Sequence, residues 1–316
     1  MLDSLLDVFQ KQNPSIAVEA SELSWADGQS KLQLAFNAGT QPDVVHIGLD
    51  WFWLFDEGGV FAELPNQART TPRAAWWLVN VRALVVQNPP PYRYGFATSD
   101  RHNVLKRCLP LLWQSGVPNF YTRLPLWPDC NEELVLALDS MRRTILTNAM
   151  IDRSRELDQA LLKGDITAVL TGAWIVEMAR ERNQRALSVL PMRSVLNADV
   201  LTISQRSANR AAAGQLIDFL CSYTNARAFA SSVPDAGFPA DLQKVGADTA
   251  FLSNPLIQGF YRTALLSAPL PYSATFLRCE PLVEDLIARC FSARNADEIR
   301  QHVNAAKEAL RVMESL

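Results

Sequence analysis

The residues best suited to chemistry in this sequence are tryptophans placed where strands end or helices begin. Trp174 lies in GDITAVLTGAWIVEM, after a short strand expected over 167–170 and before a helical pattern, and Trp51 follows the apolar stretch PDVVHIGL. Trp77 lies in the strand-like stretch WWLVNVRALVVQ. In a concave site, aromatic rings supply apolar contact and a few polar groups fix the ligand's orientation, which suits the C–H faces and hydroxyls of a sugar. The three rings therefore indicate a sugar site.

Each of these tryptophans also has a purely structural interpretation. A large aromatic side chain buries roughly 150–250 Å², so it can serve as core in any element. Trp53 could be exposed in place of Trp51, and Trp76 must face the side opposite Trp77 if their stretch is a strand. Asp50 precedes the expected helix after PDVVHIGL, so its carboxylate could either cap that helix or accept hydrogen bonds from hydroxyls.

Other kinds of chemistry find little support. The paired carboxylates Glu132 and Glu133 are adjacent, so on a helix they do not face one site, and a solvated helix face is the better interpretation than a glycosidase pair. The five cysteines are scattered and odd in number, which argues against a disulfide framework. The three histidines lie far apart in sequence, and no HExxH, Walker lysine loop, GxGxxG or GxSxG motif occurs. We therefore expect neither a metal site nor a cofactor.

Composition limits the partners and the location. The formal net charge of −3 gives no general attraction to nucleic acid. No apolar run approaches the ~20 residues of a membrane span. The start, MLDSLLDVFQKQNPS, lacks the basic, apolar and small-residue segments of a signal peptide, so the sequence as written predicts a cytoplasmic location.

The order of elements predicts an α/β fold with two domains. A chain of 316 residues, 48% of them hydrophobic, is long enough for two cores. Apolar spacing predicts a first helix with Leu2, Leu5, Leu6 and Phe9 on one face, a strand over 15–23, a helix ended by Gly39 and a strand over 42–49. Alternation of this kind favours a mainly parallel sheet. Further helices are expected over 101–116, 130–148 and 154–163, and a C-terminal helix after an Asn295 cap with Glu298 three residues later.

Several stretches resemble, in the family's order, the family 1 extracellular solute-binding proteins of bacterial ABC importers, the maltose-binding-like group. The stretch KLQLAFNAGTQPDVVHIG is similar to the family pattern K-L-x-x-A-x-A-x-G-x-x-P-D-V-V, and LLKGDITAVLTGAWIVEM is similar to F-x-x-G-x-A-A-M-x-x-x-G-x-W. The remaining stretches that carry the resemblance are LLDVFQKQNPSIAVE, WFWLFDEGGVFAEL, WWLVNVRALVVQN, AAAGQLIDFLCSYTNARAFA and DAGFPAD.

The resemblance implies a two-lobed α/β fold of the type II periplasmic-binding-protein kind, with the ligand cleft between the lobes and a hinge of crossover segments. Lobe one would hold residues 1–86 and 201–247, and lobe two residues 87–200 and 248–316. The family's first strand has no counterpart before the first helix, and NPPPYRYGF stands where the family has a longer helical segment. The chain is thus a shortened or divergent member, and a missing strand would leave an open sheet edge beside residues 15–20.

The resemblance also implies a function and further site residues. It implies non-catalytic capture of a sugar or oligosaccharide by lobe closure, importer permease subunits as partners, a monomeric state and a periplasmic or extracytoplasmic location. Asn80 and Arg82 match the family's polar strand face, although Arg82 could also hold the hinge. Asp235 and Gly237 match a loop near the cleft, and Phe276 matches a late aromatic platform. With Trp174, Trp51, Asp50 and Trp77, these residues form the expected ligand site.

Two other functional classes remain open. A cytoplasmic ligand-sensing or interaction protein could reuse the same lobes without an importer, and the absence of a leader in the written sequence favours that alternative. An enzyme is a third and weaker interpretation, because no catalytic motif supports it.

Overall fold

The chain divides into two compact units, each built from two separate stretches of sequence. The computed structural model describes residues 1–24, 27–64, 71–98, 103–123, 125–182, 187–233 and 235–314. The first unit comprises Met1–Val79 and Asn197–Asp248, and the second comprises Asn80–Leu196 and Thr249–Leu316. In the described part of the chain, no helix combines the length and the apolar character that a membrane crossing needs.

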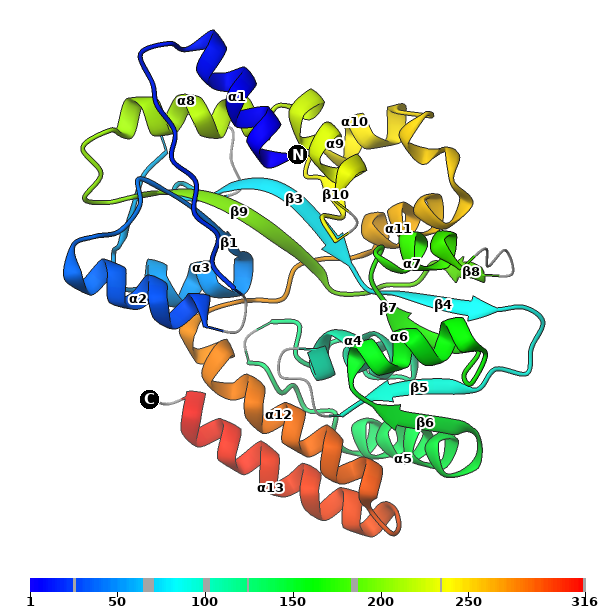
Figure 1. Ribbon diagram of the computed structural model, residues 1–316. Helices are drawn as coiled ribbons and strands as arrows, with labels where there is room; N and C mark the ends of the chain where they lie inside the picture. The colour runs from blue at the N-terminus through cyan, green and yellow to red at the C-terminus, as the bar shows by residue number, and fades with distance from the viewer. Residues whose placement is uncertain are drawn as a thin grey trace. The chain divides into compact units, whose positions relative to one another are not determined.

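The first unit is a five-stranded sheet covered by helices on both faces (Figure 1). Its strands run in the order β1-β9-β3-β10, and β2 also pairs with β9. The strands are β1 (Val44–Gly48), β2 (Phe61–Ala62), β3 (Ala75–Val81), β9 (Leu196–Ser204) and β10 (Phe238–Pro239). The helices are α1 (Leu2–Gln12), α2 (Gly28–Ala38), α3 (Leu49–Asp56), α8 (Arg210–Cys221), α9 (Tyr223–Ser232) and α10 (Leu242–Ala247).

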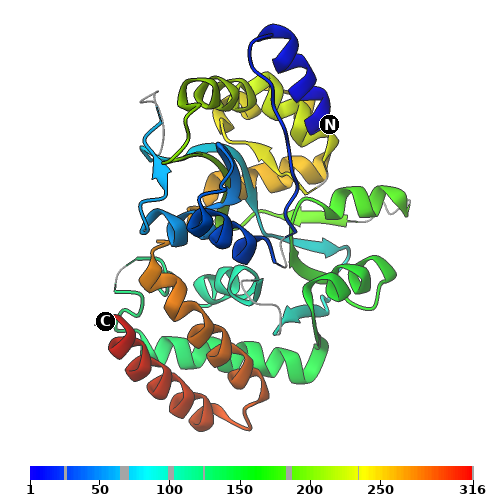
Figure 2. The same ribbon diagram turned by 60° about the vertical axis from the view of Figure 1, so that its left-hand side comes forward.

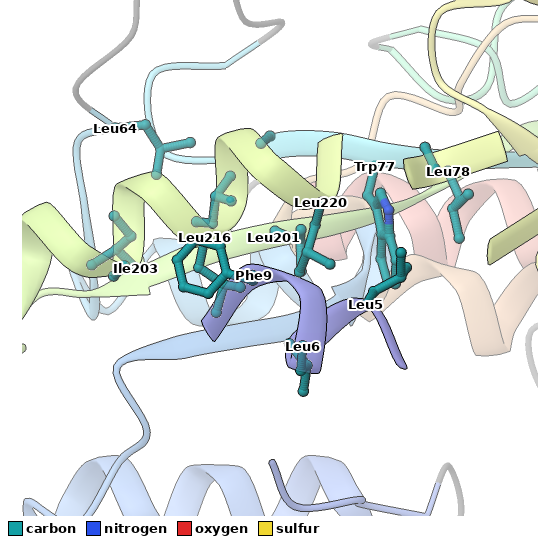
Figure 3. Packing of buried hydrophobic residues seen from close by; sticks show 14 of the residues in the cluster. Leu5, Leu6, Phe9, Leu64, Trp77, Leu78, Leu201, Ile203, Leu216 and Leu220 are labelled. Atoms are coloured by element: carbon teal, nitrogen blue, oxygen red, sulfur yellow. The ribbon is translucent and has the colours of Figure 1, made fainter. Parts of the chain in front are cut away.

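One face of this sheet packs against α1 and α8 (Figure 3). The expected apolar face of α1 is confirmed, because Leu5, Leu6 and Phe9 are buried there. Figure 3 shows these side chains beside those of α8 and of strands β3 and β9. Because side chains alternate across a strand, Leu201 and Ile203 of β9 both point into this layer.

The opposite face is filled by phenylalanines. The ring of Phe36 on α2 lies 5.6 Å from that of Phe55 on α3 and 5.7 Å from that of Phe61 on β2, between centroids. Phe52 stacks on Phe61 with ring planes only 10° apart. Aromatic pairs at these separations contribute stability beyond that of the apolar area they bury. The rings therefore fix α2 and α3 to the sheet.

Two expectations for this unit are wrong. Residues 15–23 form no strand, because Ile16 and Val18 pack against the core while the Val18 backbone N–H donates to the side-chain oxygen of Gln10 at 2.9 Å. An alternating pattern marks which side chains face the core, but a strand also needs a neighbour to pair with. Nor is the sheet mainly parallel, since β1 and β2 pair with β9, and β10 with β3, in antiparallel fashion.

The second unit holds a second five-stranded sheet and most of the helices. Its strands are β4 (Ala83–Gln87), β5 (Tyr94–Ala97), β6 (Ala149–Asp152), β7 (Ala168–Thr171) and β8 (Leu187–Leu190). Its helices are α4 (Asn103–Gln114), α5 (Asn131–Asn148), α6 (Ser154–Lys163), α7 (Ile175–Glu181), the 3-10 turn η1 (Phe251–Ser253), α11 (Pro255–Leu266), α12 (Ala274–Ser292) and α13 (Ala296–Glu314). Residues 101 and 102 of the helix expected over 101–116 lie outside the described residues.

Strand β7 occupies the middle of the second sheet. The strand order is β6-β5-β7-β4-β8, with β5 parallel to β6 and β7, and β4 antiparallel to β7 and β8. All four residues of β7 are buried. A strand with neighbours on both sides and covered faces is a rigid support, so it fixes whatever follows its C-terminal end.

The helices α12 and α13 lie side by side and pack with α5 (Figures 1 and 2). The expected start of the C-terminal helix is confirmed, because Asn295 Oδ1 accepts the backbone N–H of Glu298 at 3.0 Å. The Glu298 carboxylate in turn accepts the backbone N–H of Arg294 at 2.9 Å. The first bond satisfies a donor that the helix start leaves open, and the second ties the residue before the cap to the first turn of the helix.

The strand-like stretch WWLVNVRALVVQ forms two strands. Strand β3 ends at Val81, Arg82 lies between the strands, and β4 begins at Ala83. Strand β4 belongs to the second unit because it pairs with β7 and β8. The expected boundary at residues 86 and 87 is therefore corrected to Val79 and Asn80, and Arg82 lies in the second unit.

Candidate functional site

The turn after β7 presents Trp174 at the edge of the second unit's sheet. Strand β7 ends at Thr171, and Gly172 and Ala173 lead to Trp174, which directly precedes α7. Trp174 is half-buried, whereas Ile175 beside it is buried completely. The strand end and the helix start therefore leave part of the indole accessible, as the sequence predicted for a ring at this turn.

The edge of the Trp174 ring is held by a buried ion pair. Its indole Nε1 donates a hydrogen bond to Oδ2 of Asp158 on α6 at 2.9 Å. Both terminal nitrogens of Arg107 on α4 donate to the same carboxylate at 3.3 Å. Side chains of this pair are only 2–3% exposed. Burying an isolated carboxylate is costly, so Arg107 is what makes an ionised Asp158 tolerable at this position.

The plane of the same ring is covered by a cation. The guanidinium carbon of Arg82 lies 4.3 Å from the centroid of the Trp174 ring, well within cation–π range. Nη2 of Arg82 also approaches Oδ1 of Asn103, at the start of α4, at 3.5 Å. The structure thus brings together two of the predicted site residues, Trp174 and Arg82, which are far apart in sequence.

Gly172 makes the position of the ring possible. A Cβ atom added to Gly172 would lie 2.0 Å from Cζ3 of Trp174 and 2.4 Å from two further ring carbons. Real side chains do not approach so closely, so any residue other than glycine would push the indole away. The glycine in LTGAW is therefore a packing requirement of this tryptophan.

Trp51 and Asp50 lie together in the first unit. Helix α3 begins at Leu49, directly after β1, and its N-cap is Gly48, so the capping interpretation of Asp50, one of the two that the sequence left open, is wrong. Oδ1 of Asp50 instead accepts the backbone N–H of Trp51 at 3.0 Å. A carboxylate in the first turn still interacts favourably with the helix dipole. Trp51 is half-buried, and its Cη2 would lie 3.6 Å from a Cβ placed on Gly28.

Two predicted aromatic plates are core residues. Trp77 is 2% exposed, because it packs in the layer between the sheet and α1, with its ring centroid 4.5 Å from that of Phe229. Phe276 is fully buried in the first turn of α12, where its ring lies 4.6 Å from that of Tyr121. Neither ring offers a surface to a ligand within its unit, so both are removed from the candidate site.

The structure shows no distinctive contacts for the other three predicted residues, Asn80, Asp235 and Gly237, among the described interactions of the chain. Asn80 is half-buried near the end of β3, on the same strand as half-buried Trp76. Asp235 is exposed, and Gly237 has a positive φ of 77° in the turn before β10. A positive φ favours glycine, which explains that residue without a ligand. These three residues stay predictions as ligand contacts.

The sequence interpretation missed Asp158 and Arg107. Asp158 lies between Leu157 and Ala160 on the buried side of an amphipathic helix, and Arg107 interrupts the apolar pattern of α4. A charge inside an otherwise buried helix face is the signal that could have marked both residues, because such charges need a partner. No group of three or more metal-ligating side chains occurs in the part of the chain that the structure describes.

Comparisons with known proteins agree with the motifs. The family model of the bacterial extracellular solute-binding proteins matches residues 2–106. No curated protein matches.

Many solved structures share the fold. The sugar-binding protein MalE from Xanthomonas citri matches with a TM-score of 0.80 and 15% identity over 99% of this chain and 94% of that chain. UgpB from Mycobacterium tuberculosis, in complex with glycerophosphocholine, matches with a TM-score of 0.81 and 11% identity over 99% and 94%. A cyclo/maltodextrin-binding protein complexed with maltotetraose matches with a TM-score of 0.77 and 15% identity over 98% and 92%. The resemblance inferred from the motifs is confirmed, and the chain has the two-lobed α/β fold of the bacterial extracellular solute-binding proteins.

Proposed function

We propose that this chain is the solute-binding component of an ABC importer and that it captures a sugar or oligosaccharide without catalysis. The observation that carries the proposal is the half-buried Trp174 at the end of a central strand. Its N–H is bonded to Asp158 and the Arg82 guanidinium lies over its plane, so what the residue offers a ligand is the part of a fixed ring that stays accessible, with a cation beside it. Such a ring suits the C–H face of a sugar better than an amino acid or a metal ion.

Several proteins of the same fold support a carbohydrate ligand. One was solved with maltotetraose, another with cycloalternan, and a third is named a sugar-binding protein. UgpB was solved with glycerophosphocholine, so a glycerophosphodiester is the strongest competing solute. The Arg82 guanidinium beside Trp174 would suit the phosphate of that solute, so the binding panel must include it.

The proposed mechanism is hinge closure. The chain passes between the two units at Val79–Asn80, Leu196–Asn197 and Asp248–Thr249, and these three segments would form the hinge. Trp174 and Arg82 would supply the second unit's share of the site, and Trp51 with Asp50 the first unit's share. The protein would act as an extracytoplasmic monomer and deliver its solute to permease subunits. A cytoplasmic ligand sensor would use the same lobes without those permeases.

The test is a binding panel on the purified chain. Isothermal titration calorimetry and thermal melts would use maltose, maltotetraose, a cyclodextrin, glycerophosphocholine, spermidine and ferric ion. A ligand that binds only the folded state stabilises it by about 2.7 kcal/mol at 100 times its Kd, so a true solute raises the Tm. Saturable binding of a carbohydrate supports the proposal. Tight binding of spermidine, ferric ion or glycerophosphocholine with no carbohydrate response overturns it.

A further inference from the structure

We propose that Asp158, held in place by Arg107, is the positioning residue that fixes the orientation of the Trp174 ring and so determines how tightly the site binds. The effect of this positioning on ligand affinity rests on the proposed function. The orientation of the ring is a property of the protein alone, however, so it can be measured without any ligand.

The first argument is geometric. An indole has one hydrogen-bond donor, at one point of its edge, so a bond to that donor fixes the rotation of the ring about its side-chain torsions. In Trp174 this donor reaches Oδ2 of Asp158 at 2.9 Å. Asp158 comes from α6 and is 1% exposed, so its own side chain has no freedom to follow a moving ring. The acceptor is therefore a fixed point against which the indole is oriented.

The second argument concerns charge. Arg107 donates to both oxygens of Asp158 and links α4 to α6, so the acceptor of the Trp174 N–H is one member of a buried ion pair. A hydrogen bond to an ionised acceptor is about twice as strong as one between neutral groups. Arg107 therefore acts on the ring through Asp158.

The third argument is that the ring is restrained in two directions. Asp158 holds its edge, and the guanidinium of Arg82 lies over its plane at 4.3 Å. The approach to Gly172 leaves no room for the ring to shift toward the backbone. A rotation of the indole would break the hydrogen bond and separate the cation from the plane together. The anchored ring therefore meets a ligand already in place, which avoids the cost of ordering a side chain on binding.

The first experiment measures the ring in the ligand-free protein. The Trp174 indole N–H signal in a ¹H–¹⁵N spectrum is assigned by its absence from Trp174→Phe. Asp158→Asn keeps an acceptor but removes the charge, and it leaves Arg107 buried without its partner. The double variant Asp158→Leu/Arg107→Met removes both charges, and replacement of a buried ion pair by apolar side chains is often tolerated. We expect the Trp174 signal of the double variant to move upfield and to exchange faster with solvent. An unmoved signal in a folded double variant overturns the proposal.

A matched control is the buried ion pair of Arg142 and Asp139 on α5, 2.7 Å apart, in the same unit. The double variant Asp139→Leu/Arg142→Met should leave the Trp174 signal in place. If this variant moves the signal as far as Asp158→Leu/Arg107→Met does, the effect is a general loosening of the unit and the positioning role is refuted.

The second experiment measures binding of the carbohydrate identified by the panel. We expect Asp158→Leu/Arg107→Met to weaken it about tenfold, and the α5 control to leave it unchanged, when both are compared at temperatures where they are folded. Unchanged affinity with a moved indole signal overturns the role in binding. If the wild-type chain binds no carbohydrate, the proposed function fails, while the spectrum still decides whether Asp158 positions the ring.

Discussion

The indole Nε1 of Trp174 lies 2.9 Å from Oδ2 of Asp158, a residue sixteen positions earlier in the chain and on a different helix. The bond explains why a large aromatic side chain can stand at a turn between a strand and a helix. Its donor is satisfied inside the unit, while part of its ring stays outside the core. Asp158 thus holds the edge of the ring, while Arg82 lies over its plane.

Gly172→Ala should damage the site through the ring. The new Cβ would fall 2.0 Å from Cζ3 of Trp174, so the indole must leave its position. We expect weaker carbohydrate binding by calorimetry and a lowered Tm, since overpacking typically costs about 1–3 kcal/mol.

The control for this change is the same substitution made in Trp174→Ala. Without the ring there is nothing for the new methyl group to meet, so Gly172→Ala should cost little further stability or affinity in that background. Equal costs in both backgrounds would mean that the glycine serves the backbone, and the packing argument would be wrong.

Trp77→Ala should unfold the first unit more readily and leave the site intact. The side chain is 2% exposed in the core against α1, so its removal leaves a cavity. The free energy of unfolding should fall by about 3–5 kcal/mol, measured by chemical denaturation. Trp77→Phe keeps an aromatic ring and should cost less. Loss of carbohydrate affinity in folded Trp77→Ala, with little loss of stability, would return Trp77 to the site.

Asn295→Ala should destabilise the C-terminal helix α13. The side chain accepts the backbone N–H of Glu298 at 3.0 Å, and loss of such a cap typically costs about 1 kcal/mol. The exposed Gln301 on the same helix is a matched control, and Gln301→Ala should leave the Tm almost unchanged. Equal Tm values for the two variants would contradict the capping role.

The stability that Glu298 contributes should depend on pH. The backbone N–H of Arg294, followed by its guanidinium, lowers the pKa of the Glu298 carboxyl below its ordinary value. A carboxyl whose pKa is lower in the folded state stabilises that state above its unfolded pKa, and the contribution disappears as the pH falls through the folded pKa. The difference in Tm between the wild type and Glu298→Gln should thus be present near pH 7 and vanish once the pH has fallen below the folded-state pKa of Glu298. A difference that grows on acidification would refute this sign.

The sequence predicted helices correctly where the apolar spacing of the residues matches the face that the helix buries. The helices over 154–163 and after Asn295 form at those positions, and the last helix buries the apolar face formed by Ile299, Val303, Ala306 and Leu310. It failed at residues 15–23, because an alternating pattern does not say whether a pairing strand exists. It also placed the boundary between the units at residues 86 and 87, since an apolar run gives no sign of where the chain passes from one sheet to the other.

The site was only partly readable from the sequence. The position of Trp174 at a turn was predicted because a strand, a glycine and a helix start surround it in the chain, and its contact with a ligand stays a prediction. Trp77 and Phe276 were misplaced, because a buried aromatic and a ligand plate share the same residue type and differ only in tertiary packing. Asp158 was missed because its role depends on Arg107, which the fold brings to it from 51 positions away.

The most direct test of the account is Trp174→Ala, measured by ligand titration and by thermal melt on one preparation. Loss of the ring removes a central contact of the kind that is worth about 2–4 kcal/mol, so carbohydrate affinity should fall roughly 30- to 700-fold. The Tm should fall less than in Trp77→Ala, because a half-buried ring at a turn leaves a smaller cavity than one that is 2% exposed. A large fall in Tm with carbohydrate affinity unchanged would show that Trp174 is structural and would contradict the account.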